Sequence, residues 1–92
     1  MKEIDDIEKP VCRYAKTKGW HPIKLAIVMQ KGFPDRTFLR KGKEIFFIEF
    51  KVPGKEPNGR QRFIHKMLKG FGFDVHVVTS VEIGKLIIDS YD

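Results

Sequence analysis

The stretch over residues 44–52 constrains the fold most, because two charged residues interrupt an otherwise apolar run. Its isoleucines and phenylalanines are typical of a β-strand. Alternate residues of a strand share a face, so Glu49 and Lys51 project to one side of it. Ile48 and Phe50 project to the other. A half-buried charge is costly unless it is paired, so Glu49 and Lys51 are expected to meet a cation and an anion.

Apolar spacing and the Gly and Pro residues predict the other elements. The expected order is a helix over residues 4–18, strands over 23–29, 37–40 and 44–52, a helix over 60–71, a strand over 75–79 and a last helix capped by Ser80. The crossover from the third strand to the fourth should be right-handed and place these strands parallel. The predicted fold class is therefore α/β, a mixed four-stranded sheet flanked by helices in the order αβββαβα.

Local features refine this order. Pro10 is tolerated near the first turn of a helix, so the first helix is allowed to start as late as Asp6 or Lys9. Lys41 and Gly42 predict a tight hairpin between the second and third strands. Apolar residues of the second helix are expected together on one side of it: Phe63, Ile64, Met67, Leu68 and Phe71.

Length and composition bound the class of protein. With 92 residues, 41% hydrophobic and 33% charged, the chain is typical of one soluble globular domain, expected over residues 1–92. No apolar run is long enough for a transmembrane helix, and the polar, acidic start argues against a signal peptide. Cys12 is the only cysteine, which excludes an intramolecular disulfide and a cysteine zinc site. These features agree with an intracellular protein in which Cys12 is a small buried hydrophobe.

The net charge of +6 favours an anionic partner. Basic residues concentrate between positions 51 and 69, where Glu56 is the single acid. They are Lys51, Lys55, Arg60, Arg62, Lys66 and Lys69. Charge alone indicates nucleic acid only weakly, because many basic proteins bind none. A solvated face stays the alternative for these residues.

Asp35 is expected beside Glu49. If the hairpin turns at residues 41–42, residues whose numbers sum to about 83 lie opposite each other, which places Asp35 near Phe47 to Glu49. Two adjacent carboxylates repel unless a proton or a metal intervenes, and oxygen ligands suit Mg²⁺ or Mn²⁺. Lys51 beside them is then available to orient a water or neutralise a phosphate. The alternative for Asp35 is an ordinary turn residue after Pro34.

An ordered set of motifs resembles the VRR-NUC family, a branch of the PD-(D/E)XK nuclease superfamily with a restriction-endonuclease-like core. The similarity runs from about Glu8 to the C-terminal helix. The motifs are Gly32-Phe33-Pro34-Asp35, Phe47-Ile48-Glu49-Phe50-Lys51, Gln61, and Gly72-Phe73-Asp74-Val75-His76-Val77-Val78-Thr79-Ser80. Family members often carry Gly-Arg before the first motif, whereas Met29-Gln30-Lys31 stands here, and Lys31 keeps the charge without the bidentate geometry of arginine.

The resemblance implies a metal-dependent DNA endonuclease and a role for each matching residue. The metal ligands would be Asp35, Glu49, the carbonyl of Phe50 and, directly or through water, Glu8. Lys51 would be the catalytic lysine and Gln61 would hold the active-site groups or the water. Lys24 would face the scissile phosphate. Small members of the family resemble homodimers that cut four-way DNA junctions in phages and bacteria, which implies branched DNA and a second copy as partners.

Other interpretations stay open for several of these residues. Glu8 also fits an Asp5-x-x-Glu8 capping box. Gln61 also fits an exposed helix position, and His65, on the same face, fits either a substrate contact or a surface histidine. Phosphate contacts are expected from some of the basic residues, namely Lys31, Arg60, Arg62 and Lys66. A non-catalytic DNA-binding domain and a subunit that needs a partner for DNA targeting are the alternative functions.

Overall fold

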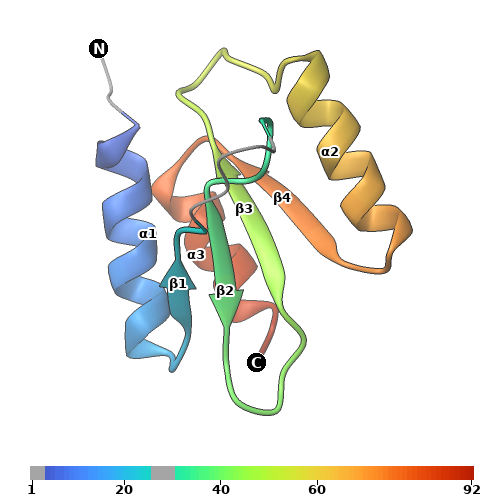
Figure 1. Cartoon of the computed structure of the whole chain (residues 1–92). Helices are drawn as coiled ribbons and strands as arrows, with labels where there is room; N and C mark the ends of the chain where they lie inside the picture. The colour runs from blue at the N-terminus through green and yellow to red at the C-terminus, as the bar shows by residue number, and fades with distance from the viewer. Residues whose placement is uncertain (1–3, 26–30) are drawn as a thin grey trace.

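The computed structural model describes residues 4–25 and 31–92 and has the expected order of elements (Figure 1). The elements are α1 (Asp5–Thr17), β1 (His21–Ile23), β2 (Arg36–Leu39), β3 (Phe46–Phe50), α2 (Gly59–Gly70), β4 (Asp74–Val78) and α3 (Val81–Asp89). Ser80 caps α3 as predicted, since its hydroxyl accepts a hydrogen bond from the Ile83 N–H at 3.2 Å. Among the described residues, no helix is long and apolar enough to cross a membrane.

The four strands form one mixed sheet in the order β1-β2-β3-β4. β1 pairs with β2 and β2 with β3 in antiparallel fashion, whereas β3 and β4 run parallel. In the β2–β3 pair, Arg36 lies opposite Ile48 and Phe38 opposite Phe46, so partner numbers sum to 84. The predicted mixed sheet is confirmed. Continued by one residue, this register brings Asp35 beside Glu49.

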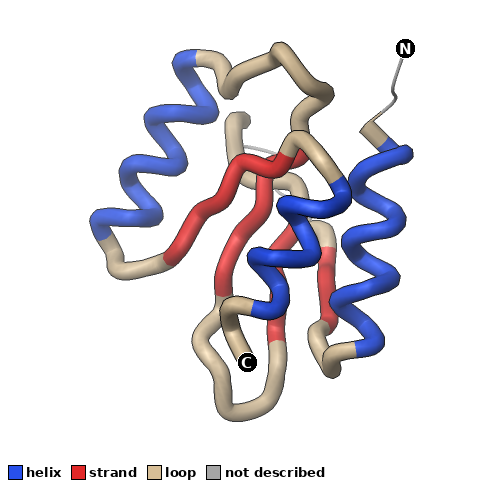
Figure 2. Tube along the Cα trace, turned by 180° about the vertical axis from the view of Figure 1, so that it is seen from behind, coloured by secondary structure: helices blue, strands red, loops and turns tan. Residues whose placement is uncertain are grey.

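The helices cover both faces of the sheet (Figures 1 and 2). α3 lies behind the sheet in Figure 1 and in front of it in Figure 2, packed beside α1, while α2 covers the opposite face. Ile48 and Phe50 pack on the face with α1 and α3. Phe47 packs on the other face with Ile64 of α2. Because side chains of β3 alternate, Glu49 projects to the α2 face together with Phe47.

The first strand differs from the prediction of residues 23–29. It covers His21–Ile23, directly after a turn in which Gly19 has a φ of +87° and Trp20 is buried. Pro22 is accepted there because β1 is an edge strand, where a missing N–H costs no central hydrogen bond. Residues 26–30, which include the predicted Met29 and Gln30, lie outside the described residues.

Two further differences concern the helices. Pro10 lies inside α1, which begins earlier than Pro10 suggested, at Asp5. The five apolar residues predicted on one side of α2 are not all buried. Ile64 and Leu68 are buried, whereas three others are exposed: Phe63 by 59%, Met67 by 38% and Phe71 by 73%. A helix that covers one face of a small sheet buries only a narrow stripe.

Tyr91 packs the C-terminal end of the chain against the sheet. Its ring stacks on Phe46 with a centroid distance of 4.0 Å. Its hydroxyl donates to Asp74 Oδ2 at 2.7 Å and lies 2.6 Å from His76 Nε2. Burial lowers the pKa of His76, with Lys69 acting in the same direction and Asp74 against it. A neutral His76 therefore donates its Nε2–H to the Tyr91 oxygen.

Candidate active site

Glu49 lies at the centre of the candidate site and is only 3% exposed. Its Oε2 accepts a hydrogen bond from Gln61 Nε2 at 3.0 Å and lies 3.7 Å from Lys51 Nζ. Its Oε1 is buried and has no hydrogen-bond partner within the described part of the chain. Glu49 therefore keeps one carboxylate oxygen available to a further ligand.

Burial and the neighbouring Asp35 carboxylate raise the pKa of Glu49 to about 7, while Lys51 opposes this shift. Desolvation disfavours a charged carboxylate, and a second carboxylate nearby disfavours it further. Near neutral pH, both the protonated and the ionised form of Glu49 are therefore populated. A cation bound beside it would favour the ionised form.

Asp35 stands directly before β2, and its position follows from the β2–β3 register. Its Oδ2 accepts a hydrogen bond from the Phe50 N–H at 2.8 Å, which fixes the carboxylate against β3. Burial raises the pKa of Asp35, with the Phe50 hydrogen bond lowering it and Glu8 raising it. The expected proximity of Asp35 and Glu49 is thus present in the structure.

Lys51 follows β3, and its N–H donates to the Val78 carbonyl at 3.0 Å, which extends the parallel pairing past the strand. This extension keeps its side chain on the same face as Glu49. The side chain is 18% exposed. Phe50, between them, is 1% exposed on the other face, so only its main chain reaches the site.

Gln61 connects the site to α2. Its N–H donates to Asn58 Oδ1 at 2.8 Å, and its own Oε1 accepts from the Asn58 N–H at 2.9 Å. This reciprocal capping box leaves the Gln61 Nε2 group directed at Glu49. Gln61 is therefore no freely exposed helix residue. The capping role was missed in the sequence, although Asn58-x-x-Gln61 carries its signature.

Glu8 has a different partner from the one that the sequence suggested. It is 5% exposed, and Arg36 Nε donates to its Oε2 at 2.6 Å, with Lys24 Nζ at 4.0 Å. The capping-box interpretation fails, because α1 has no side-chain cap and Asp5 lies within the helix. Among residues 4–25 and 31–92, no three Asp, Glu, His or Cys side chains lie close enough together to hold a metal. A metal-ligand role for Glu8 stays a prediction.

Known proteins resemble this chain in sequence and in fold. No protein-family model matches the sequence. "Putative nuclease p44" of Acyrthosiphon pisum secondary endosymbiont phage 1 is 29% identical over 83 residues, covering 90% of this chain and 89% of that protein. A solved structure described as "VRR_NUC domain" is 22% identical and matches over 100% of both chains with a TM-score of 0.89. A second, "VRR_NUC domain protein", is 18% identical, with coverages of 99% and 90% and a TM-score of 0.75.

This chain has the VRR_NUC fold. The resemblance drawn from the motifs is confirmed at this level, and so is the predicted fold class. In this VRR_NUC fold the site occupies one end of the central β2–β3 pair, with Gln61 reaching it from the helix that follows β3.

The donor set of this VRR_NUC fold suits a divalent cation. Glu49 carries a buried oxygen that has no hydrogen-bond partner among the described residues. Burial raises the pKa of both Asp35 and Glu49, and the Asp35 carboxylate raises that of Glu49 further. A cation bound to these two carboxylates would offset the cost of burying their charge and the repulsion between them. Oxygen ligands of this kind suit Mg²⁺ and Mn²⁺. Asp35 and Glu49 would hold the ion, with the Phe50 carbonyl as the predicted main-chain ligand.

The predicted DNA-contacting residues lie on several sides of this centre. Lys24 is beside Glu8, and the Lys31 carbonyl accepts a hydrogen bond from Arg60 Nε at 3.2 Å. The remaining three line one groove next to α2: Arg62, His65 and Lys66. His65 Nε2 is 3.8 Å from Glu49 Oε1, and burial lowers the His65 pKa. A neutral His65 forms no ion pair with Glu49.

Proposed function

We propose that this protein is a Mg²⁺- or Mn²⁺-dependent endonuclease that hydrolyses DNA phosphodiester bonds. The observation that carries the proposal is the buried Glu49, which has Asp35 and Lys51 beside it and Gln61 holding one of its oxygens. The phage relative named as a nuclease and the VRR_NUC fold support it. The single buried Cys12 agrees with the intracellular setting that we propose, in a bacterium or a phage-infected host.

A divalent cation at Asp35 and Glu49 would acidify water and withdraw charge from the phosphate. The chain's own residues do the positioning. The Phe50 N–H fixes the Asp35 carboxylate, and the Gln61 amide fixes that of Glu49. Lys51 brings a positive charge to the scissile phosphate and a hydrogen-bond donor to the attacking water. Lys24, paired with Glu8, approaches the same end of the sheet and adds charge for the DNA backbone.

Four-way DNA junctions are the substrate that we propose, cut by a homodimer. The resemblance to small members of the VRR-NUC family implies this substrate and this assembly, and two active sites related by a twofold axis match the symmetry of a junction. The alternative is a non-catalytic or partner-dependent DNA-binding domain. The ion pair with Arg36 occupies the Glu8 carboxylate, which the family resemblance assigns to the metal site, and this favours that alternative.

The test is cleavage of a labelled four-way junction, a flap and a plain duplex with Mg²⁺, with Mn²⁺ and with chelator. Lys51→Ala and Asp35→Ala run alongside, with the exposed Lys16→Ala as the matched control. We expect metal-dependent cutting of the junction that both site variants lose and the control keeps. Folded protein that binds DNA without cutting it would support the binding domain instead. A monomer mass by light scattering at working concentration would contradict the dimer.

A further inference from the structure

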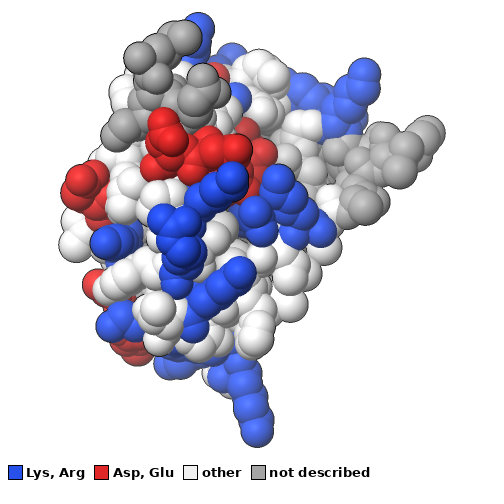
Figure 3. All heavy atoms as spheres, turned by 90° about the vertical axis from the view of Figure 1, so that its left-hand side faces the viewer, with Lys and Arg blue, Asp and Glu red and all other residues white. Residues whose placement is uncertain are grey.

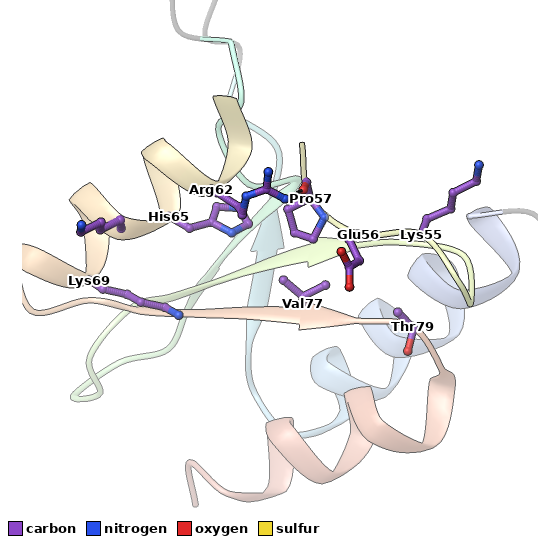
Figure 4. A pocket seen from close by; sticks show the side chains of 9 residues that line it. Lys55, Glu56, Pro57, Arg62, His65, Lys69, Val77 and Thr79 are labelled. Atoms are coloured by element: carbon purple, nitrogen blue, oxygen red, sulfur yellow. Dashed lines mark hydrogen bonds between the residues drawn. The ribbon is translucent and has the colours of Figure 1, made fainter. Parts of the chain in front are cut away.

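A groove lies beside the candidate active site, between α2 and β4, with a volume of about 730 Å³ (Figure 4). Val77 of β4 and Thr79, which follows that strand, form its floor, and residues 55–57 close one end. Arg62 Nη1 donates to the Pro57 carbonyl at 2.5 Å, which ties this loop to α2. Because β4 is an edge strand, no further strand of the sheet covers its outer side.

The groove is strongly basic. Four cations line it against the single acid Glu56: Lys55, Arg62, Lys66 and Lys69. None of the four forms an ion pair with an acid in residues 4–25 or 31–92. The face that α1 covers differs, since acidic and basic side chains gather next to each other there (Figure 3). The groove is thus complementary to a polyanion.

The floor of the groove is apolar at Val77, next to the polar Thr79. Val77 is 39% exposed at its centre, and Pro57 lies at its edge. A duplex presents phosphates on its outside and keeps its bases stacked, so it has no free base face to lay on such a floor. A single strand presents bases beside its phosphates and is bound by a cationic groove with surfaces that accept a base. The positive charge and the apolar floor of the groove together favour a single strand over a duplex.

The groove is continuous with the candidate active site through His65. This side chain lines the groove, and its Nε2 lies 3.8 Å from Glu49 Oε1. A strand that follows the groove therefore arrives next to the carboxylate that we place at the cleavage centre.

We infer that the groove between α2 and β4 binds one unpaired DNA strand beside the cleavage centre. The strand's phosphates contact Lys66 and Lys69, and a base rests on Val77. This inference rests on the proposed nuclease function, because it assigns the path of the strand that the site cuts. A flap offers such unpaired nucleotides directly, whereas a four-way junction offers them when base pairs open at its branch point.

The first test measures binding of fluorescent oligothymidylate by anisotropy in chelator, over a series of salt concentrations. Each lost phosphate contact on a single strand reduces the salt slope by about 0.7, so Lys66→Ala/Lys69→Ala should reduce it by about 1.4 and weaken binding about tenfold. Lys16→Ala/Lys43→Ala removes the same charge at exposed positions outside the groove. This control should reduce the salt slope and the affinity much less than Lys66→Ala/Lys69→Ala does. Equal effects of the two double variants would overturn the inference.

The second test separates the groove from a general basic surface. Val77→Arg adds a cation but fills the floor, so we expect weaker binding of oligothymidylate and unchanged or tighter binding of a hairpin duplex. Leu86→Arg adds the same charge at an exposed apolar position outside the groove, so it should bind oligothymidylate no more weakly than the wild type. Tighter binding of both probes by Val77→Arg would overturn the inference, since charge alone would then account for binding. Circular dichroism and thermal unfolding verify that each variant folds.

Both tests are independent of cleavage. A protein that cuts DNA but shows no groove effect would contradict this inference and leave the nuclease proposal standing. A groove effect without metal-dependent cutting would contradict the nuclease proposal and support strand binding by a non-catalytic domain.

Discussion

The ion pair between Arg36 and Glu8 should contribute strongly to stability. Glu8 is 5% exposed, and Arg36 donates to it at 2.6 Å and to the Pro22 carbonyl at 3.1 Å. Arg36→Met keeps much of the apolar stem but leaves the Glu8 carboxylate buried without its main partner. Removing one partner of a buried pair costs about 3–5 kcal/mol. Lys24, at 4.0 Å, stays as a weaker partner, so we expect about 3 kcal/mol.

Urea unfolding measures this cost as a shift of the midpoint at unchanged slope. In a domain of this size, about 3 kcal/mol also lowers Tm by about 12–24 °C. Glu8→Gln and the double variant Glu8→Gln/Arg36→Met complete a double-mutant cycle. The double variant should be more stable than the two single effects predict, because it leaves no buried charge unpaired. A loss below about 1 kcal/mol for Arg36→Met, or additive effects, would refute this reasoning.

Glu8→Gln also separates the ion-pair role from the metal-ligand role suggested by the family resemblance. A ligand that binds only the folded protein raises Tm with its concentration. If Glu8 serves Arg36 alone, the rise of Tm with Mg²⁺ should be the same in Glu8→Gln as in the wild type. A reduced rise would place Glu8 at the metal.

Two further predictions concern the core. A Cβ at Gly84 would lie 2.5 Å from Val11 Cγ2, so Gly84→Ala should destabilise by about 1–2 kcal/mol in urea, after about 1 kcal/mol is regained from helix propensity. Gly70→Ala, with open space around it, should cost nothing; equal losses would refute the steric cause. Because the folded-state pKa of His76 is lowered, its contribution is full above about pH 6.5 and is lost as pH falls below it. His76→Gln should remove this part of the pH dependence of the urea midpoint, and an unchanged profile would contradict it.

The central strand pair could be predicted because its signal is local. The alternation in β3 placed Glu49 and Lys51 on one face, and the hairpin arithmetic placed Asp35 beside them within one residue of the observed register. Burial of a charged residue in an apolar strand needs a compensating partner, so the same pattern marked the candidate site.

The sequence did not indicate the contacts between residues far apart in the chain. Arg36 pairs with Glu8 across 28 positions, and nothing in the spacing of α1 points to β2. The exposed side of α2 could not be separated from its buried side, because Phe63 and Ile64 are equally apolar and only the position of the sheet distinguishes them. The start of β1 depends on burial of Trp20 after the Gly19 turn, which is again a tertiary contact.

The most direct test of the central claim is the metal-dependent rate at which Glu49→Gln cuts a labelled DNA junction, compared with the wild type. The glutamine keeps the size of the side chain and an oxygen within reach of Gln61, but it removes the charge that would hold the cation. We predict folded protein whose cleavage rate at saturating Mg²⁺ falls more than about a hundredfold, because loss of a metal ligand exceeds the effect of losing a residue that only orients one. Cleavage at the wild-type rate would contradict the assignment of the active site to Glu49.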